Sequence, residues 1–154
     1  MKDIKNNMKK KVGNKKMNNK TIGNNFENNL SLILSDLGYW VSLFTPKSHS
    51  NSQPADMIAV RDDVALLIDA KTLKNKNGLF PISRIEENQI FAAKKFLKCG
   101  NAWYNFAILW DNIIYMIPFN TIDFSKKSID LKEQIPFLNH YSERIKKINE
   151  NLYR

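Results

Sequence analysis

Two apolar runs separated by a short polar turn constrain this chain more than any other feature of its sequence. Ala55–Val60 and Val64–Ala70 are rich in aliphatic and β-branched residues, and a polar Arg-Asp-Asp step separates them. Such runs predict two strands, and the short step between them predicts an antiparallel hairpin. If Asp62-Asp63 is a two-residue loop, counting back along the paired strands places Asp56 opposite Asp69.

Two opposed carboxylates destabilise a sheet unless something neutralises them, because directly paired Cβ atoms lie roughly 4.5–5.5 Å apart. Lys71 follows Asp69 by two residues and therefore shares its face of the strand. Asp56, Asp69 and the carbonyl of Ala70 could supply three oxygen ligands to Mg²⁺ or Mn²⁺, with water and a phosphate completing the octahedron. Lys71 could orient or deprotonate an attacking water, or stabilise charge on the phosphate.

Other readings of these residues stay open. A slip of one residue in the hairpin sends Asp69 to the opposite face from Asp56, and Asp-Asp is not a preferred two-residue turn. A bulge would restore the arrangement. Taken singly, Asp56 reads as a surface acid and Lys71 as a lysine that protects a strand edge. The hairpin context is what favours a shared site.

A helix is predicted before the hairpin, over Asn24–Leu37. Its apolar residues fall within a stripe about 100° wide, and Gly38 follows as the end signal. Glu27 lies about 20° around the helix from Leu34, at the edge of this stripe. There it could bind a metal directly or through water, although alone it reads as an ordinary boundary glutamate.

The remaining patterns complete a mixed sheet. A strand is predicted over 39–45, and 102–109 and 113–117 predict a second hairpin turning at Asp111-Asn112. A capping-box pattern at 83–86 predicts a helix ending near Lys98, and helical spacing of apolar residues predicts a terminal helix from about His140. The expected fold class is α/β, with a mixed five-stranded sheet flanked by helices.

The positive charge is concentrated at the start of the chain. The net charge is +9, yet residues 1–20 alone carry eight lysines and one acid. We expect residues 1–20 to be a basic, disordered arm and residues 21–154 to form one domain. The arm fits sequence-independent binding of phosphate backbones, but it fits a solubilising tail equally well.

Composition excludes several other classes. One cysteine and two histidines cannot build a thiolate or imidazole metal cluster, so any metal must be held by oxygen. No apolar run approaches the roughly 18 residues that a membrane span requires, and nothing at the start resembles a secretory signal. We therefore expect a cytoplasmic protein with no membrane partner.

The motifs as a set resemble the PD-(D/E)xK nucleases. Pro54-Ala55-Asp56, Asp69-Ala70-Lys71 and the upstream Gly23–Glu27 carry the resemblance, and more narrowly they are similar to RecU-type and archaeal Holliday-junction resolvases. The segment Leu79–Gln89, with its Phe-Pro pair and its glutamine, strengthens the RecU-type likeness.

The resemblance implies a restriction-endonuclease-like (PD-(D/E)xK) core in a homodimeric, Mg²⁺-dependent endonuclease. Such an enzyme nicks four-way DNA junctions at symmetric positions during DNA recombination and repair. The resemblance assigns metal ligation to Glu27, Asp56 and Asp69 and the catalytic lysine to Lys71, and Gln89 is expected to face the site because it interrupts an apolar helix face.

Two departures from the RecU-type pattern bear on the substrate. Asp69 stands where those proteins usually have glutamate, and the long stalk they insert is replaced by the short segment 46–54. The short loop resembles the archaeal resolvases, in which a loop serine assists; Ser48, Ser50 and Ser52 are candidates, and plain turn serines are an equal reading.

Rival functions also remain. The same core supports repair or restriction-type endonucleases, and a non-catalytic basic DNA-binding protein on this fold would be expected to lose the acid–lysine set. For a homodimer, the candidate surfaces are the strand Tyr39–Phe44 and the terminal helix, either of which could equally be core.

Overall fold

The computed structural model describes residues 19–45, 53–101 and 103–152. It opens with helix α1, Asn19–Asp36, which begins five residues before the predicted start. The prediction took its start from the apolar stripe, whereas backbone hydrogen bonding carries a helix past the residues that anchor it. Asn19 and Lys20, assigned to the arm from the sequence, are therefore helical. Residues 1–18 lie outside the described residues.

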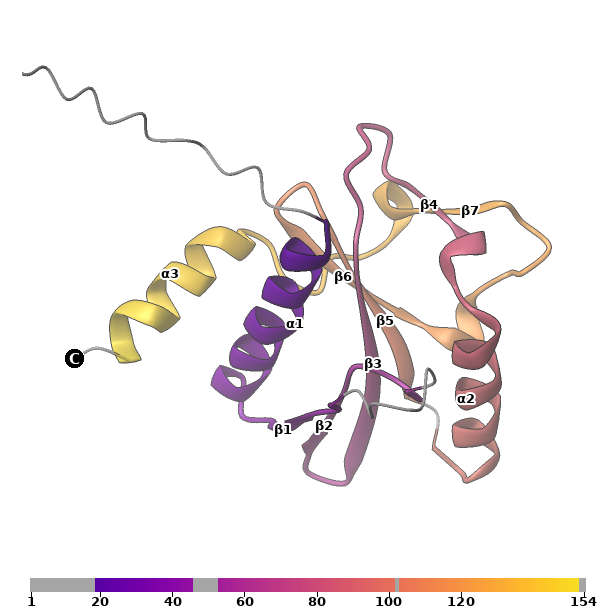
Figure 1. The fold of residues 1–154 in the computed structure, drawn as a ribbon, viewed down its shortest axis with the longest axis horizontal. Coiled ribbons are helices and arrows are strands. Elements are labelled where there is room, and N and C mark those ends of the chain that lie inside the picture. Colours follow the sequence, from indigo (N-terminus) through magenta and orange to yellow (C-terminus); the bar gives the residue numbers. More distant parts are fainter. Residues whose placement is uncertain (1–18, 46–52, 102, 153–154) are drawn as a thin grey trace, which may run out of the picture.

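A five-stranded mixed sheet forms the centre of the molecule, as predicted (Figure 1). Its strand order is β1-β2-β3-β5-β6, with β3 and β5 parallel and the other neighbours antiparallel. The strands are β1 (Trp40–Leu43), β2 (Met57–Arg61), β3 (Val64–Thr72), β5 (Tyr104–Trp110) and β6 (Ile113–Pro118).

The β2–β3 hairpin has the predicted two-residue turn. Arg61 pairs with Val64, and the ladder continues regularly to Met57 opposite Ile68. Asp62 takes φ 52°, a left-handed conformation that aspartate tolerates in such turns. The β5–β6 hairpin also turns where expected, with Asp111 and Asn112 both left-handed at φ 49° and 61°.

Helices cover both faces of the sheet (Figure 1). Helices α1 and α3 (Tyr141–Leu152) lie on one side, where the fully buried Leu30, Ile33 and Leu34 of α1 join the buried Ile148 of α3 in one apolar cluster. Helix α2 (Glu87–Lys98) covers the other side. The terminal helix predicted from the sequence is therefore part of the core.

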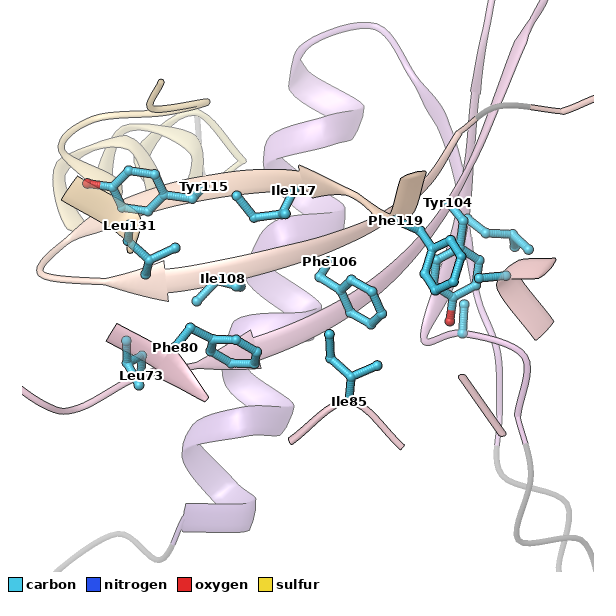
Figure 2. Close-up of a cluster of buried hydrophobic side chains, with 13 residues drawn as sticks. Leu73, Phe80, Ile85, Tyr104, Phe106, Ile108, Tyr115, Ile117, Phe119 and Leu131 are labelled. Carbon is cyan, nitrogen blue, oxygen red and sulfur yellow. The ribbon is translucent and has the colours of Figure 1, made fainter. Parts of the chain in front are cut away.

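The cluster beneath α2 is rich in aromatic residues (Figure 2). Tyr104 and Phe106 of β5 are fully buried and meet edge to face, with ring centroids 5.6 Å apart. Phe119 follows β6 and contacts Tyr104 at 6.3 Å, also edge to face. Two of these rings, Tyr104 and Phe106, thus belong to β5, the parallel neighbour of the strand that carries Asp69 and Lys71.

Two features depart from the sequence prediction. Helix α2 begins at Glu87 with Glu86 as its N-cap, and its capping box joins Glu86 to Gln89, not Ser83 to Glu86. Ile82–Arg84 instead forms a short 3₁₀ turn. A second sheet pairs β4 (Leu79–Pro81) with β7 (Ser128–Asp130), and neither strand was predicted because each has only three residues.

None of the described helices is long and apolar enough to cross a membrane.

Candidate active site

Asp56 stands at the point where the β2–β3 ladder ends. Its N–H donates to the carbonyl of Ile68 at 3.0 Å, although Ile68 is already the ladder partner of Met57. Asp56 is thus an extra residue at the strand start, as in a β-bulge, and not a regular partner of Asp69. Its Oδ2 accepts a hydrogen bond from the Ala70 N–H at 2.7 Å, which turns the carboxyl toward β3.

Asp69 lies on β3 and is only 5% exposed. Lys71 Nζ lies 2.9 Å from Asp69 Oδ2, as expected for two residues on one strand face. That buried oxygen accepts no aligned hydrogen bond from the described part of the chain. Lys71 is itself largely buried, with its ammonium 5.9 Å from the centroid of the Phe106 ring. Asp69 therefore offers one oxygen that is paired by charge alone.

Gln89 reaches the site from the first turn of α2. Its Nε2 donates to Asp69 Oδ1 at 3.0 Å, and its Oε1 accepts from the Glu86 N–H at 3.0 Å. The side chain is 8% exposed, so both bonds are shielded from water. The amide that interrupts the apolar helix face thus contacts Asp69 and orients its carboxyl.

The carboxylates act on one another electrostatically. Burial, and then the negative charge of Asp69, raise the pKa of Asp56 to about 7, against the hydrogen bond from Ala70, with Glu27 adding to the rise. Burial and the Asp69 charge also raise the pKa of Glu27. Glu27, on α1, is therefore near enough to sense the acids of the hairpin.

The geometry fits a hard divalent cation bound by the two carboxylates of Asp56 and Asp69. It fits less well a cation bound by three carboxylates. Among the described residues, no three acidic, histidine or cysteine side chains gather to hold a metal. Asp56 and Asp69 do come together, each with a feature that a cation would relieve. The pKa of Asp56 is raised, and one buried oxygen of Asp69 accepts no aligned hydrogen bond from the described residues. Since the Ala70 N–H points to Asp56, its carbonyl points to the same side of β3 and adds an oxygen donor.

The loop serines that were candidates for the site cannot be placed relative to it. Ser48, Ser50 and Ser52 lie outside the described residues.

One contact near the site was not predicted. The Tyr104 hydroxyl donates to the Pro54 carbonyl at 2.6 Å. The two residues are 50 positions apart, and no sequence pattern joins them.

Comparison with known proteins supports the fold. No protein-family model and no curated protein matches the sequence. Among solved structures, the chain is similar to Hjc of Archaeoglobus fulgidus, a Holliday junction resolvase from an archaeal hyperthermophile, with a TM-score of 0.54 and 20% identity over 71% of this chain and 89% of that chain. It is also similar to the bacterial homing endonuclease I-Ssp6803I, with a TM-score of 0.49 and 12% identity over 88% of this chain and 97% of that one. The likeness to Hjc confirms the predicted architecture: the chain shares with that protein a mixed α/β fold built on a five-stranded sheet.

Proposed function

We propose that this protein is a divalent-metal-dependent endodeoxyribonuclease. The observation that carries the proposal is the meeting of Asp56, Asp69 and Lys71 at the open end of the β2–β3 ladder. Among the described residues, the buried Asp69 Oδ2 is paired with the Lys71 ammonium and accepts no aligned hydrogen bond. A buried acid beside a second acid and a lysine stabilises no core, because like charges close together are unfavourable. Such a cost is characteristic of a functional site.

Each residue has a role that follows from its contacts. Asp56 and Asp69 would hold Mg²⁺, or Mn²⁺ in its place, with the Ala70 carbonyl as a third donor and Glu27 acting through water. The ion would supply Lewis-acid activation of the phosphate and of water. Lys71, fixed beside Asp69, would orient the attacking water or offset negative charge on the phosphate. Gln89 is a positioning residue, because it touches Asp69 alone among these groups.

The substrate we propose is a four-way DNA junction, nicked in two strands of like polarity. The fold shared with an archaeal junction resolvase supports this choice, as does the short segment between β1 and β2. One domain with one acid–lysine set can cut one strand at a time, so paired cuts need a second copy. A repair or restriction-type endonuclease is the rival, and it differs in cutting plain duplex equally well.

The exposed apolar surfaces favour two faces for the proposed homodimer. Helix α3 is a weak candidate because Ile148 is buried. The edge strand β1 exposes 65% of Trp40, and α2 exposes 69% of Phe91 beside an apolar groove of about 430 Å³. Exposed aromatic side chains of this kind are typical of subunit interfaces. We place the dimer contact on α2, and Phe91→Glu should yield a monomer by light scattering.

A nicking assay tests the proposal. Asp69→Asn and Lys71→Ala should each lower Mg²⁺-dependent cleavage of a junction by at least about 100-fold, while junction binding stays within about threefold. Asp63→Asn, an exposed acid in the turn of the same hairpin, is the matched control and should cut like the wild type. Near-normal nicking by Lys71→Ala would refute the nuclease assignment, and equal cutting of junction and linear duplex would leave a nuclease and remove the resolvase.

A further inference from the structure

The segment that carries Asp56 has an anchor outside the ladder. Pro54 lies two residues before Asp56, and its carbonyl accepts the hydrogen bond from the Tyr104 hydroxyl at 2.6 Å. Tyr104 belongs to β5, which is separated from β2 by β3. The bond therefore ties the approach to Asp56 to a strand in the middle of the sheet.

The position of the Tyr104 hydroxyl is set by the core and not by the segment it holds. The residue is fully buried, and its ring meets Phe106 and Phe119 edge to face (Figure 2). A ring fixed on two sides presents its hydroxyl in one place. Burial, then the charges of Asp69 and Asp56, raise the pKa of Tyr104 far above its ordinary value, so the hydroxyl stays a donor at every working pH.

Two backbone hydrogen bonds fix the main chain at Asp56 itself, and upstream the Gln53 side-chain amide donates to the Phe44 carbonyl at 3.4 Å. The Asp56 N–H donates to Ile68, and its carbonyl accepts from the Phe44 N–H at 2.9 Å. These bonds do not fix the direction in which the chain approaches Asp56. That direction depends on how the residues before Asp56 are held. That direction matters here because Asp56 lies beyond the regular ladder, so the ladder itself does not fix how its carboxyl meets Asp69.

We propose that Tyr104 is a positioning residue for the metal site: its hydroxyl holds Pro54 so that the Asp56 carboxyl stays beside Asp69. The inference rests on the proposed function and adds to it a residue from a different strand. Tyr104 is not expected to touch DNA or metal. Its effect should appear in how tightly the two acids bind a cation, and less in the rate once the cation is bound.

Tyr104→Phe removes the hydroxyl and keeps the ring. We expect it to bind Mn²⁺ about 10-fold more weakly than the wild type in calorimetric titrations without DNA, in line with other groups that orient metal ligands. Junction nicking at saturating Mg²⁺ should return to within about threefold of the wild type. Tyr115→Phe is the matched control, since Tyr115 is a buried tyrosine of the same cluster on β6, and it should bind Mn²⁺ normally.

The outcomes separate this inference from the proposed function. Equal Mn²⁺ affinity in Tyr104→Phe and the wild type would overturn the role of Tyr104 and leave the nuclease proposal standing. No Mn²⁺ binding by the wild type would overturn both. If Tyr104→Phe loses its near-ultraviolet circular dichroism, Tyr104→Met, which also fills the space without a hydroxyl, replaces it. A variant that is only less stable to heat, with unchanged Mn²⁺ affinity, also counts against the proposal.

Discussion

The two hairpins of the central sheet have nearly the same construction and differ where they end. In both, a two-residue turn is followed by regular antiparallel pairs. At the sixth pair from the turn, the β5–β6 hairpin still pairs Asn105 with Pro118, and this is the last pair of its ladder. At the equivalent place the β2–β3 ladder has already ended, and Asp56 and Asp69 meet there. The β5–β6 hairpin therefore keeps its sixth backbone pair, whereas the β2–β3 hairpin lacks this pair and has the candidate site in its place.

The difference shows that the site is a local departure from regular structure inside an otherwise ordinary scaffold. The sixth pair of the β5–β6 hairpin is neutral, whereas at the same place in the β2–β3 hairpin a carboxylate oxygen takes the place of a backbone acceptor. The Ala70 N–H illustrates this, because it donates to the Asp56 side chain. Exchanging acid and amide between the two hairpins should therefore change the stability of the protein by very unequal amounts.

The largest effect on stability at neutral pH is expected from Asn105→Asp. Asn105 is 3% exposed in the centre of the sheet, where a carboxylate would be buried without a cation, and we expect a loss of about 3 kcal/mol in urea unfolding. The reverse exchange, Asp69→Asn, should stay within about 1 kcal/mol, because relief of Asp56 and Glu27 offsets the lost ion pair with Lys71. Equal losses in both variants would contradict the comparison.

A second effect depends on pH. The pKa of Asp56 rises from 3.8 to about 7 on folding, so the folded state holds this proton more tightly than the unfolded chain does. This contribution to stability is complete below pH 3.8 and is lost as the pH rises toward 7. We expect about 4 kcal/mol between the two limits, measured as the difference between wild type and Asp56→Asn in metal-free buffer. Saturating Mg²⁺ should flatten the difference; a flat curve without metal would show that Asp56 titrates normally.

The smallest expected effect distinguishes the role of Gln89 in capping α2 from its role in orienting Asp69. Gln89→Met removes the side-chain bonds to the Asp69 carboxyl and to the Glu86 backbone N–H. Glu86→Ala removes only the bond in which the Glu86 side chain accepts from the Gln89 backbone N–H. Both should cost about 1 kcal/mol of stability. Only Gln89→Met should also slow nicking, by about 10-fold. A similar slowing in Glu86→Ala would mean that the start of α2, and not the amide, controls Asp69.

Much of the scaffold could be predicted from local patterns. The hairpin turn at Asp62-Asp63 fixes the register, and alternation then places Lys71 beside Asp69, which the ion pair confirms. The glutamine at 89 was recognisable as a polar residue on an apolar helix face. These signals all arise within a single element or across one short turn.

What could not be predicted depends on contacts between distant residues. Strand β4 pairs with β7 through Leu79 and Asp130, and three-residue strands carry no periodicity of their own. The bulge at Asp56 depends on a cross-strand bond to Ile68. The Tyr104–Pro54 bond depends on how a whole sheet is folded. The metal, the junction preference and the dimer stay predictions, because each needs a partner that one chain does not contain.

The exposed thiol of Cys99 offers a practical way to follow these events. It is the sole cysteine of the sequence and stands just past the end of α2, lining the groove beside Phe91. A maleimide dye would therefore attach at one position without any mutation of the chain. Gln89, at the other end of α2, donates a hydrogen bond to Asp69. The dye would therefore lie at the end of α2 that is farther from the candidate site. Fluorescence from that one label would report subunit association on α2 without disturbing a catalytic side chain.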